Sequence, residues 1–388
     1  MSKGIRPEDL DKRGDGRDID PSRGELSGEG AWQRVKEREL APPNPTPREM
    51  GIRPTRSDVT SETPSYYGQP MLKEPVWIWS IPLYFYVGGT AGAASLLGAT
   101  AEVLGGERLR PLGVRCRWLG AVGDSVSAGL LIHDLGRPER FLHMLRVFRP
   151  TSPMNLGTWI LSGSGAMNGA AAVLSGQKGW LGRAGDGAAL IGGLLGMPLA
   201  GYTAVLITNT SVALWQSVHK TLPLLFMASS VAGAGSLLQL LPHEPGEERI
   251  LHLFSMGGKV AALAAGLATH RDVSRVEAVG RPLRQGWMGA MWVAAQVCTA
   301  ASLALDVWPE RRRPATKVAA AVLGTAGALL TRFAVFYAGK KSARDPQATF
   351  QGQRQGLGAA EVTGHTHASD GKPLKFPLPV LRDAPALK

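Results

Sequence analysis

The charged residues of this chain gather towards its two ends, and long uncharged stretches fill its middle. Residues 75–101, 150–177, 187–218 and 221–242 contain no Asp, Glu, Lys or Arg. Crossing a hydrocarbon core of about 30 Å takes about 20 helical residues. The alternating pattern of barrel strands is missing, and lipid requires a backbone that satisfies its own hydrogen bonds. The pattern therefore predicts membrane-spanning helices.

Extending the same reading along the chain predicts eight spans. They lie at about 76–103, 117–135, 154–175, 186–208, 219–241, 251–270, 286–307 and 316–339. The expected fold class is an all-α integral membrane protein, with a bundle of about eight transmembrane helices within residues 74–340. The first 70 residues show no apolar run typical of a cleavable signal peptide. We therefore expect the first span to act as its own insertion signal.

The two ends of the chain have a different character. Residues 1–73 are rich in charged residues, Pro and Gly, and residues 341–388 are similar. Such segments bury too little apolar surface to fold alone, so we expect a disordered N-terminal arm and a polar C-terminal tail that order on a partner. The formal charge of +12 lies largely in loops and tails. It suits membrane lipid headgroups and not nucleic acid. Because arginines occupy loops on both sides, the charge bias selects no orientation.

Small residues at helical spacing suggest how the spans pack. Gly88 and Gly92 form one GxxxG pair, and Gly192 and Gly196 form another. Glycines at this spacing let helix backbones approach closely in lipid. We interpret both pairs as packing surfaces of a compact bundle.

Ionisable residues inside spans are candidates for function because they are costly there. Asp124 lies in the middle of the second span, beside Ser125 and Ser127. It suits proton transfer, or it is a structural carboxylate bonded to a neighbouring helix. Arg332 lies in the last span, where an ion pair with Asp124 or another acid and snorkelling to the interface are both open. Lys259 falls near an uncertain helix boundary, and we assign it no function.

Two tyrosines place hydroxyl groups inside spans. Tyr84 lies in the first span and Tyr202 in the fourth. A buried phenol needs a hydrogen-bond partner. A quinone carbonyl is one possible partner, and ordinary core packing is the alternative. The two cysteines, Cys116 and Cys298, cannot supply the four thiolates of an iron–sulfur cluster. We predict no metal site.

The loop HDLGRPERFLHMLRVFRPTSPMNLGTW (133–159) is dense in charge and proline between two spans. It resembles the signature loop of the NrfD-like family, the membrane subunits of polysulfide-reductase-type complexes. Four other segments are similar to helices of that family in the same order: WIWSIPLYFYVGGTAG (77–92), LAGYTAVLITNTSVALW (199–215), LPLLFMASSVAGAG (222–235) and LLTRFAVFYAG (329–339). Together these segments are distributed along residues 76–340.

The resemblance implies an eight-helix subunit in the plasma membrane of a prokaryote, without haem or an iron–sulfur cluster of its own. Such subunits bind a quinone (menaquinone or ubiquinone) near one membrane face. They dock a ferredoxin-like iron–sulfur subunit there, which connects to a catalytic subunit such as a molybdenum enzyme. The expected function is exchange of electrons and protons between the quinone pool and that partner.

Individual positions can be carried over from the family. Tyr84 falls where some members have a histidine beside the quinone, and Tyr202 falls on a tyrosine of the same pocket. Asp124 matches an acidic position of the second helix. Ile81 departs from the family pattern, because polysulfide reductase has a hydrogen-bonding Asn there.

The loop itself supplies the remaining candidates. Asp134, Arg137 and Arg140 match the part of the loop that closes the quinone face. Arg137 or Arg140 would steady negative charge on the quinone or lock Asp134 in place. His133, whose side chain titrates near pH 6.5 when unperturbed, would pass protons together with Asp124.

Three other readings stay open at this point. A b-type cytochrome needs histidine ligands inside spans, whereas His133, His219, His252 and His270 lie close to span ends. A transporter or proton channel would use Asp124, Lys259 and Arg332 along a path, although the two halves show no convincing repeat. A pure membrane anchor would keep the packing glycines and the loop without a quinone site.

Overall fold

A computed structural model describes residues 19–20, 25–26, 70–137, 139–308 and 313–354. The strands β1 (Ile19–Asp20) and β2 (Glu25–Leu26) form a two-residue antiparallel pair. Every other regular element in the described part is a helix, which confirms the expected all-α class. Most of the expected arms lies outside the described residues, so their disorder stays a prediction.

Eight long helices make up the body of the protein. They are α3 (Ser80–Gly105), α4 (Arg110–Leu135), α6 (Pro153–Leu174), α7 (Trp180–Thr208), α9 (Thr221–Gln239), α10 (Pro245–Val273), α12 (Gly286–Val307) and α13 (Pro314–Arg344). Short elements connect or follow them: η1 (Gly106–Leu109), α5 (Glu139–Arg146), α8 (Ala213–Ser217), α11 (Glu277–Arg284) and α14 (Pro346–Arg354). The last long helix and α14 extend beyond the expected end of the helical domain at residue 340.

By length and apolar composition, five of these helices in the described residues are able to cross a membrane: α7, α9, α10, α12 and α13. The protein is therefore a multi-pass membrane protein, but the expected count of eight spans is not confirmed. The other three long helices, α3, α4 and α6, do not meet this measure. The helix α4 carries three arginines and two aspartates.

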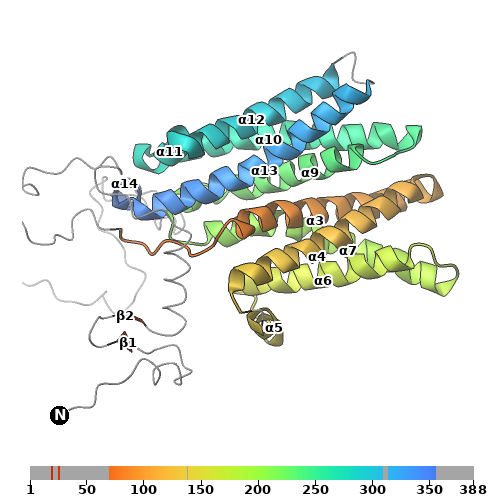
Figure 1. Ribbon diagram of the computed structural model, residues 1–388, viewed down its shortest axis with the longest axis horizontal. Coiled ribbons are helices and arrows are strands. Elements are labelled where there is room, and N and C mark those ends of the chain that lie inside the picture. The colour runs from red at the N-terminus through yellow and green to blue at the C-terminus, as the bar shows by residue number, and fades with distance from the viewer. Residues whose placement is uncertain (1–18, 21–24, 27–69, 138, 309–312, 355–388) are drawn as a thin grey trace, which may run out of the picture.

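The eight long helices form two groups of four (Figure 1). In the first bundle, α3 and α6 each pack against both α4 and α7. In the second bundle, α9 and α12 each pack against both α10 and α13. Contacts of α9 with α3 and α7, and of α13 with α3, join the two bundles. Each bundle therefore surrounds an interior of its own.

The two ends of this body differ. We call the end that carries α5, α11, α14 and the start of α3 the loop end, seen on the left of Figure 1. The opposite end, which we call the far end, carries η1 and the turns before α7 and α10. At the far end the turn before α10 is fixed by a capping box between Glu244 and Glu247, and Arg115 of α4 pairs with Glu247.

A close approach of α3 and α7 in the first bundle joins the two predicted GxxxG pairs. Gly92 of α3 lies against Gly196 of α7, and a Cβ added to either glycine would meet the main-chain oxygen of the other. A side chain at this point would force the helices apart. The small residues of these two GxxxG pairs thus act as packing positions.

A lead-in segment, residues 70–79, crosses the loop end before α3 begins. Glu74 forms ion pairs with Arg344 and, at 3.2 Å, with Lys340 of α13. Trp77 stacks on the buried Trp215, with ring centroids 6.2 Å apart. The lead-in segment therefore ties the end of the second bundle to the start of the first (Figure 1).

Candidate functional site

One side of α4 carries polar residues into the first bundle. Arg117, Asp124, Ser127 and Asp134 are all buried. Their spacing of three or seven residues places them on one face of the helix. This polar face of α4 runs from the far end to the loop end. A single helix thus positions the candidates Asp124 and Asp134 together with Ser127.

Asp124 lies deep in the first bundle and is 1% exposed. One of its carboxylate oxygens accepts hydrogen bonds from Ser164 Oγ at 2.7 Å and Asn168 Nδ2 at 2.8 Å, both from α6. The other oxygen, Oδ1, is buried and has no hydrogen-bond partner among the described residues. An ionised carboxylate accepts at both oxygens, and a protonated one can donate. The free oxygen is therefore a position where a proton can be held.

Tyr84 is 1% exposed, and its hydroxyl has no hydrogen-bond partner in the described structure. A Cβ built on Gly88 would lie 3.6 Å from the Tyr84 ring and 3.2 Å from the hydroxyl of Ser127. The Ser127 hydroxyl also lacks a partner. Burying a hydroxyl without a partner is costly. These two hydroxyl-bearing side chains, both next to Gly88, suit a ligand that accepts hydrogen bonds.

Tyr202 packs against α6, where its ring takes the space that a side chain on Gly157 would need. It is partly buried and contacts the same apolar cluster to which Tyr84 belongs. That cluster also contains Ile81, Leu131 and Leu161.

The two phenols lie at a similar depth below the loop end. Tyr84 is about one turn inside the start of α3, and Gly157 is about one turn inside the start of α6. Tyr202 is less than two turns from the end of α7. The phenols therefore belong to one layer, although no direct contact joins Tyr84 to Tyr202. The apolar Ile81 side chain, 3% exposed, occupies this layer and offers no hydrogen bond.

The loop residues lie at the surface of the same end. His133 is exposed, and its ring lies 5.9 Å from that of Trp79. Asp134 turns inward and accepts a hydrogen bond from the main-chain N–H of Ile78 at 3.0 Å. Nine residues, or about 14 Å of helix, separate His133 from Asp124. The structure thus does not bring these two candidates for proton transfer into contact.

The two loop arginines differ in their surroundings. Arg137 is exposed, and Arg140 is partly buried and donates to the main-chain oxygen of Leu135 at 3.4 Å. Arg140 therefore helps to fasten α5 to the end of α4. The short helix α5 itself buries none of its residues.

Arg332 is fully enclosed in α13, but it does not pair with Asp124. Its guanidinium donates to Ser229 Oγ at 2.6 Å, Ser230 Oγ at 2.8 Å and the main-chain oxygen of Phe226 at 2.7 Å. It also lies 3.9 Å from the centre of the Phe226 ring. These partners belong to α9, whereas Asp124 faces α6. Among the described residues no carboxylate pairs with Arg332, so the expected ion pair is replaced by neutral acceptors and an aromatic ring.

The ion pair inside the second bundle is formed by two other residues. Lys259 Nζ of α10 lies 2.5 Å from Asp306 Oδ2 of α12, and Lys259 is 0% exposed. The sequence interpretation gave Lys259 no function and did not single out Asp306. The sequence did contain a sign of this ion pair, because a lysine and an aspartate lie in two different predicted spans.

A second charged cluster lies at the far end of the first bundle. Arg117 pairs with Glu102 at 2.8 Å and with Asp186 at 2.6 Å. It connects the end of α3 and the start of α7 to α4. Its position at three helix ends indicates a structural clamp.

Among the described residues, no group of three or more His, Cys, Asp or Glu side chains is arranged to hold a metal ion. Cys116 is buried and Cys298 is partly buried, and both are free thiols.

Long apolar helices in two bundles, each enclosing ionisable side chains, define a multi-pass helical membrane protein. Comparison with known families assigns it more narrowly. Residues 69–342 match the family described as polysulphide reductase, NrfD, and the chain belongs to this family. The resemblance inferred from the loop and the four helical segments is thereby confirmed. No curated protein sequence matches the chain.

Proposed function

We propose that this chain is the membrane subunit of a quinone-linked oxidoreductase complex in the plasma membrane of a prokaryote. It would exchange electrons and protons between the quinone pool and an iron–sulfur partner. Membership of the NrfD family supports this function. The observation that carries the proposal is the buried, unpartnered hydroxyl of Tyr84 in the layer that also holds Tyr202, above the buried Asp124.

The quinone head group would lie in this layer of the first bundle, near the loop end. The hydroxyls of Tyr84 and Ser127 lack partners and would donate hydrogen bonds to a carbonyl oxygen. Tyr202 would bound the other side of the site from α7. The apolar side chains of Ile81, Leu131 and Leu161 would contact the ring and exclude water. A bound menaquinone or ubiquinone supplies two-electron, two-proton redox chemistry.

Proton handling falls to residues of α4. Asp124 would hold a proton at its free oxygen Oδ1, while Ser164 and Asn168 keep the other oxygen fixed. Ser127 lies one turn from Asp124 towards the loop end. His133 would exchange protons with water at the surface. Because about 14 Å separate His133 and Asp124, water or Ser127 would have to connect them.

The loop end would also receive the partner. The exposed side chains of Leu142, Val147 and Phe148 lie on or next to α5, which buries none of its own residues. Arg137 adds positive charge beside them, and Asp134 and Arg140 would hold the loop in shape over the site. This combination of apolar and basic groups fits a ferredoxin-like iron–sulfur subunit, which would connect to a catalytic subunit such as a molybdenum enzyme.

The experiment compares single variants of the tagged full chain, purified with its partners from native membranes. We expect Tyr84→Phe and Asp124→Asn each to lower quinone-coupled turnover at least about tenfold, in the range of a lost proton-transfer group. Tyr202→Phe should raise the quinone concentration needed for half-maximal turnover. Tyr337→Phe is the control, because this partly buried phenol of α13 contacts Trp287 of α12, in the second bundle.

Mass spectrometry of the same preparation identifies bound quinone and co-purifying proteins. If Tyr202→Phe and Asp124→Asn both leave quinone-coupled turnover unchanged, the proposed site is wrong. A complex with an iron–sulfur protein but without quinone would instead favour a membrane anchor.

A further inference from the structure

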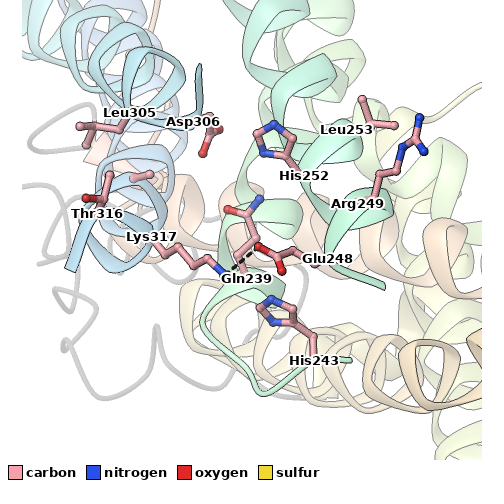
Figure 2. Close-up of a pocket in the computed structure, with 11 residues that line it drawn as sticks. Gln239, His243, Glu248, Arg249, His252, Leu253, Leu305, Asp306, Thr316 and Lys317 are labelled. Carbon is pink, nitrogen blue, oxygen red and sulfur yellow. Dashed lines mark ion pairs between the residues drawn. The ribbon is translucent and has the colours of Figure 1, made fainter. Parts of the chain in front are cut away.

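The second bundle contains a pocket at the far end, away from the proposed quinone layer. The cavity has a volume of about 530 Å³. Side chains from the end of α9, from α10, α12 and α13 line it, among them His243, Glu248, Arg249, His252, Asp306 and Lys317 (Figure 2). An ion pair of 2.7 Å between Lys317 and Glu248 bridges α13 and α10 at its side.

The buried ion pair of this bundle meets the pocket on one side only. Asp306 lines the pocket and is 5% exposed, whereas Lys259 does not line it and is fully enclosed. The carboxylate therefore lies between the pocket and the ammonium group. Burying an ion pair is costly, and this one reaches the pocket through its carboxylate and not through its ammonium group.

Behind the ion pair, polar groups from three helices converge beside Gly324 of α13. A Cβ built on Gly324 would lie 3.0 Å from both Lys259 Cε and Ser302 Oγ, and it would also meet the hydroxyl of Ser236. The Ser236 hydroxyl is buried and has no hydrogen-bond partner in the described residues. The glycine leaves room for the lysine side chain next to this hydroxyl.

The polar groups continue along one side of α9 towards the middle of the protein. Ser230, Gly233 and Ser236 follow one another at intervals of three residues, which places them on the same face. Gly233 lies beside the ring of Tyr86 and the hydroxyl of Thr90, both from α3. The hydroxyls of Tyr86 and Thr90 are buried next to each other. Ser230 accepts a hydrogen bond from Arg332.

We infer that the pocket and the Lys259–Asp306 pair form a proton-loading site, which takes up protons from water at the far end of the second bundle. The polar groups that line the pocket together with Asp306 are His252, Glu248 and Arg249 from α10, Lys317 from α13, Gln239 from the end of α9 and His243 from the α9–α10 connection. Imidazoles titrate near neutral pH and suit delivery of protons to the carboxylate.

The loading step is a proton transfer that balances in itself. A proton from water or from a protonated histidine of the pocket binds to the carboxylate of Asp306 and forms a carboxylic acid. The ammonium of Lys259 then loses its counter-charge, and it can donate a hydrogen bond to the hydroxyls beside Gly324. Release of the proton restores the ion pair. This site lies outside the proposed quinone layer and does not depend on it.

The first test is chemical labelling of the intact, tagged protein in native membranes, without turnover. Dicyclohexylcarbodiimide reacts with protonated carboxyl groups in apolar surroundings, and peptide mass spectrometry measures modification of Asp306 between pH 5 and 9. We expect labelling that falls about tenfold per pH unit once the carboxyl is mostly ionised. Lys259→Met should extend labelling to higher pH, because it removes the neighbouring positive charge. Absent or pH-independent labelling would overturn the inference.

The second test asks from which side water reaches the site. In a background with Cys116→Ala and Cys298→Ala, Leu305→Cys places a thiol in the pocket, and Arg137→Cys marks the loop end. Val293→Cys, exposed on the outer surface of α12, is the control. A membrane-impermeant thiol reagent should modify Leu305→Cys only from the side opposite to Arg137→Cys, and it should leave Val293→Cys unmodified.

A pocket thiol that does not react, or that reacts from the loop-end side, rules out proton entry from the far end. Both tests proceed without quinone turnover. Their results do not depend on whether the quinone proposal is correct. The two proposals are therefore tested independently.

Discussion

The carboxylate of Asp134 accepts a hydrogen bond from the main-chain N–H of Ile78 at 3.0 Å, across 56 residues of sequence. The bond fastens the lead-in segment to the end of α4, where the candidate loop begins. Asp134 is 9% exposed, so water replaces the bond poorly. A residue carried over from the family as part of the loop that closes the quinone face therefore also has a structural role at the edge of that site.

We expect Asp134→Ala to lower the free energy of unfolding by about 1–3 kcal/mol, because the Ile78 N–H loses an acceptor. Asp134→Asn keeps an acceptor oxygen and should retain most of the stability. Thermal unfolding of the purified protein in detergent, followed by helical circular dichroism, measures both. Equal melting temperatures for wild type and Asp134→Ala would show that the bond contributes nothing.

Asn168→Ala should destabilise the first bundle by about 1–3 kcal/mol, since it removes a donor to a buried carboxylate. Asn209→Ala is a suitable control, because the Asn209 side chain is exposed at the end of α7 and bonds only to Val205 of its own helix. The same unfolding assay compares the two. If both variants unfold like the wild type, Asp124 does not depend on α6.

Gly196→Ala should cost about 1–3 kcal/mol through overpacking, because the new methyl group meets the backbone of α3 at Gly92. Gly169→Ala in α6 serves as its matched control, since a Cβ there meets no atom within 4 Å. That change should be neutral, or stabilise the helix by about 0.5–1 kcal/mol. Similar losses in both variants would argue against close packing of α3 on α7.

Glu74→Gln should loosen the lead-in segment, because Lys340 and Arg344 lose their carboxylate partner. The contribution of a partly exposed pair is small, about 1 kcal/mol or less. Hydrogen exchange of residues 70–79 is therefore a better measure than global stability. The wild type should show the same increase in exchange at high salt, which screens the pair. Unchanged exchange in the variant would contradict this role.

The helices could be predicted from the sequence, and their neighbours could not. The predicted span 286–307 coincides with α12, because length and apolar composition decide which segments cross a membrane. These properties do not determine which helix faces which. Asp124 was recognisable as a buried carboxylate, but its partners Ser164 and Asn168 lie 40 and 44 residues away on another helix.

Arg332 also shows that the sequence does not reveal the partners of a buried charge. A guanidinium inside a membrane suggests an acid nearby, yet hydroxyls, carbonyl oxygens and an aromatic ring surround this one. Serine usually bonds to its own helix, so Ser229 and Ser230 gave no sign of an arginine partner. Lys259 and Asp306 could have been paired by charge, but 47 residues, including the whole of α11, separate them.

The contacts of the lead-in segment also have a consequence for biosynthesis. Glu74 leaves the ribosome before any long helix has been made, whereas its partners Lys340 and Arg344 are translated near the end of α13. Trp77 can likewise stack on Trp215 only after Trp215 has been translated. The first helix can enter the membrane early, but the segment before it reaches its final place only after the last helix is inserted. A truncated chain would leave these residues uncovered, which gives membrane proteases a means to distinguish incomplete from finished molecules.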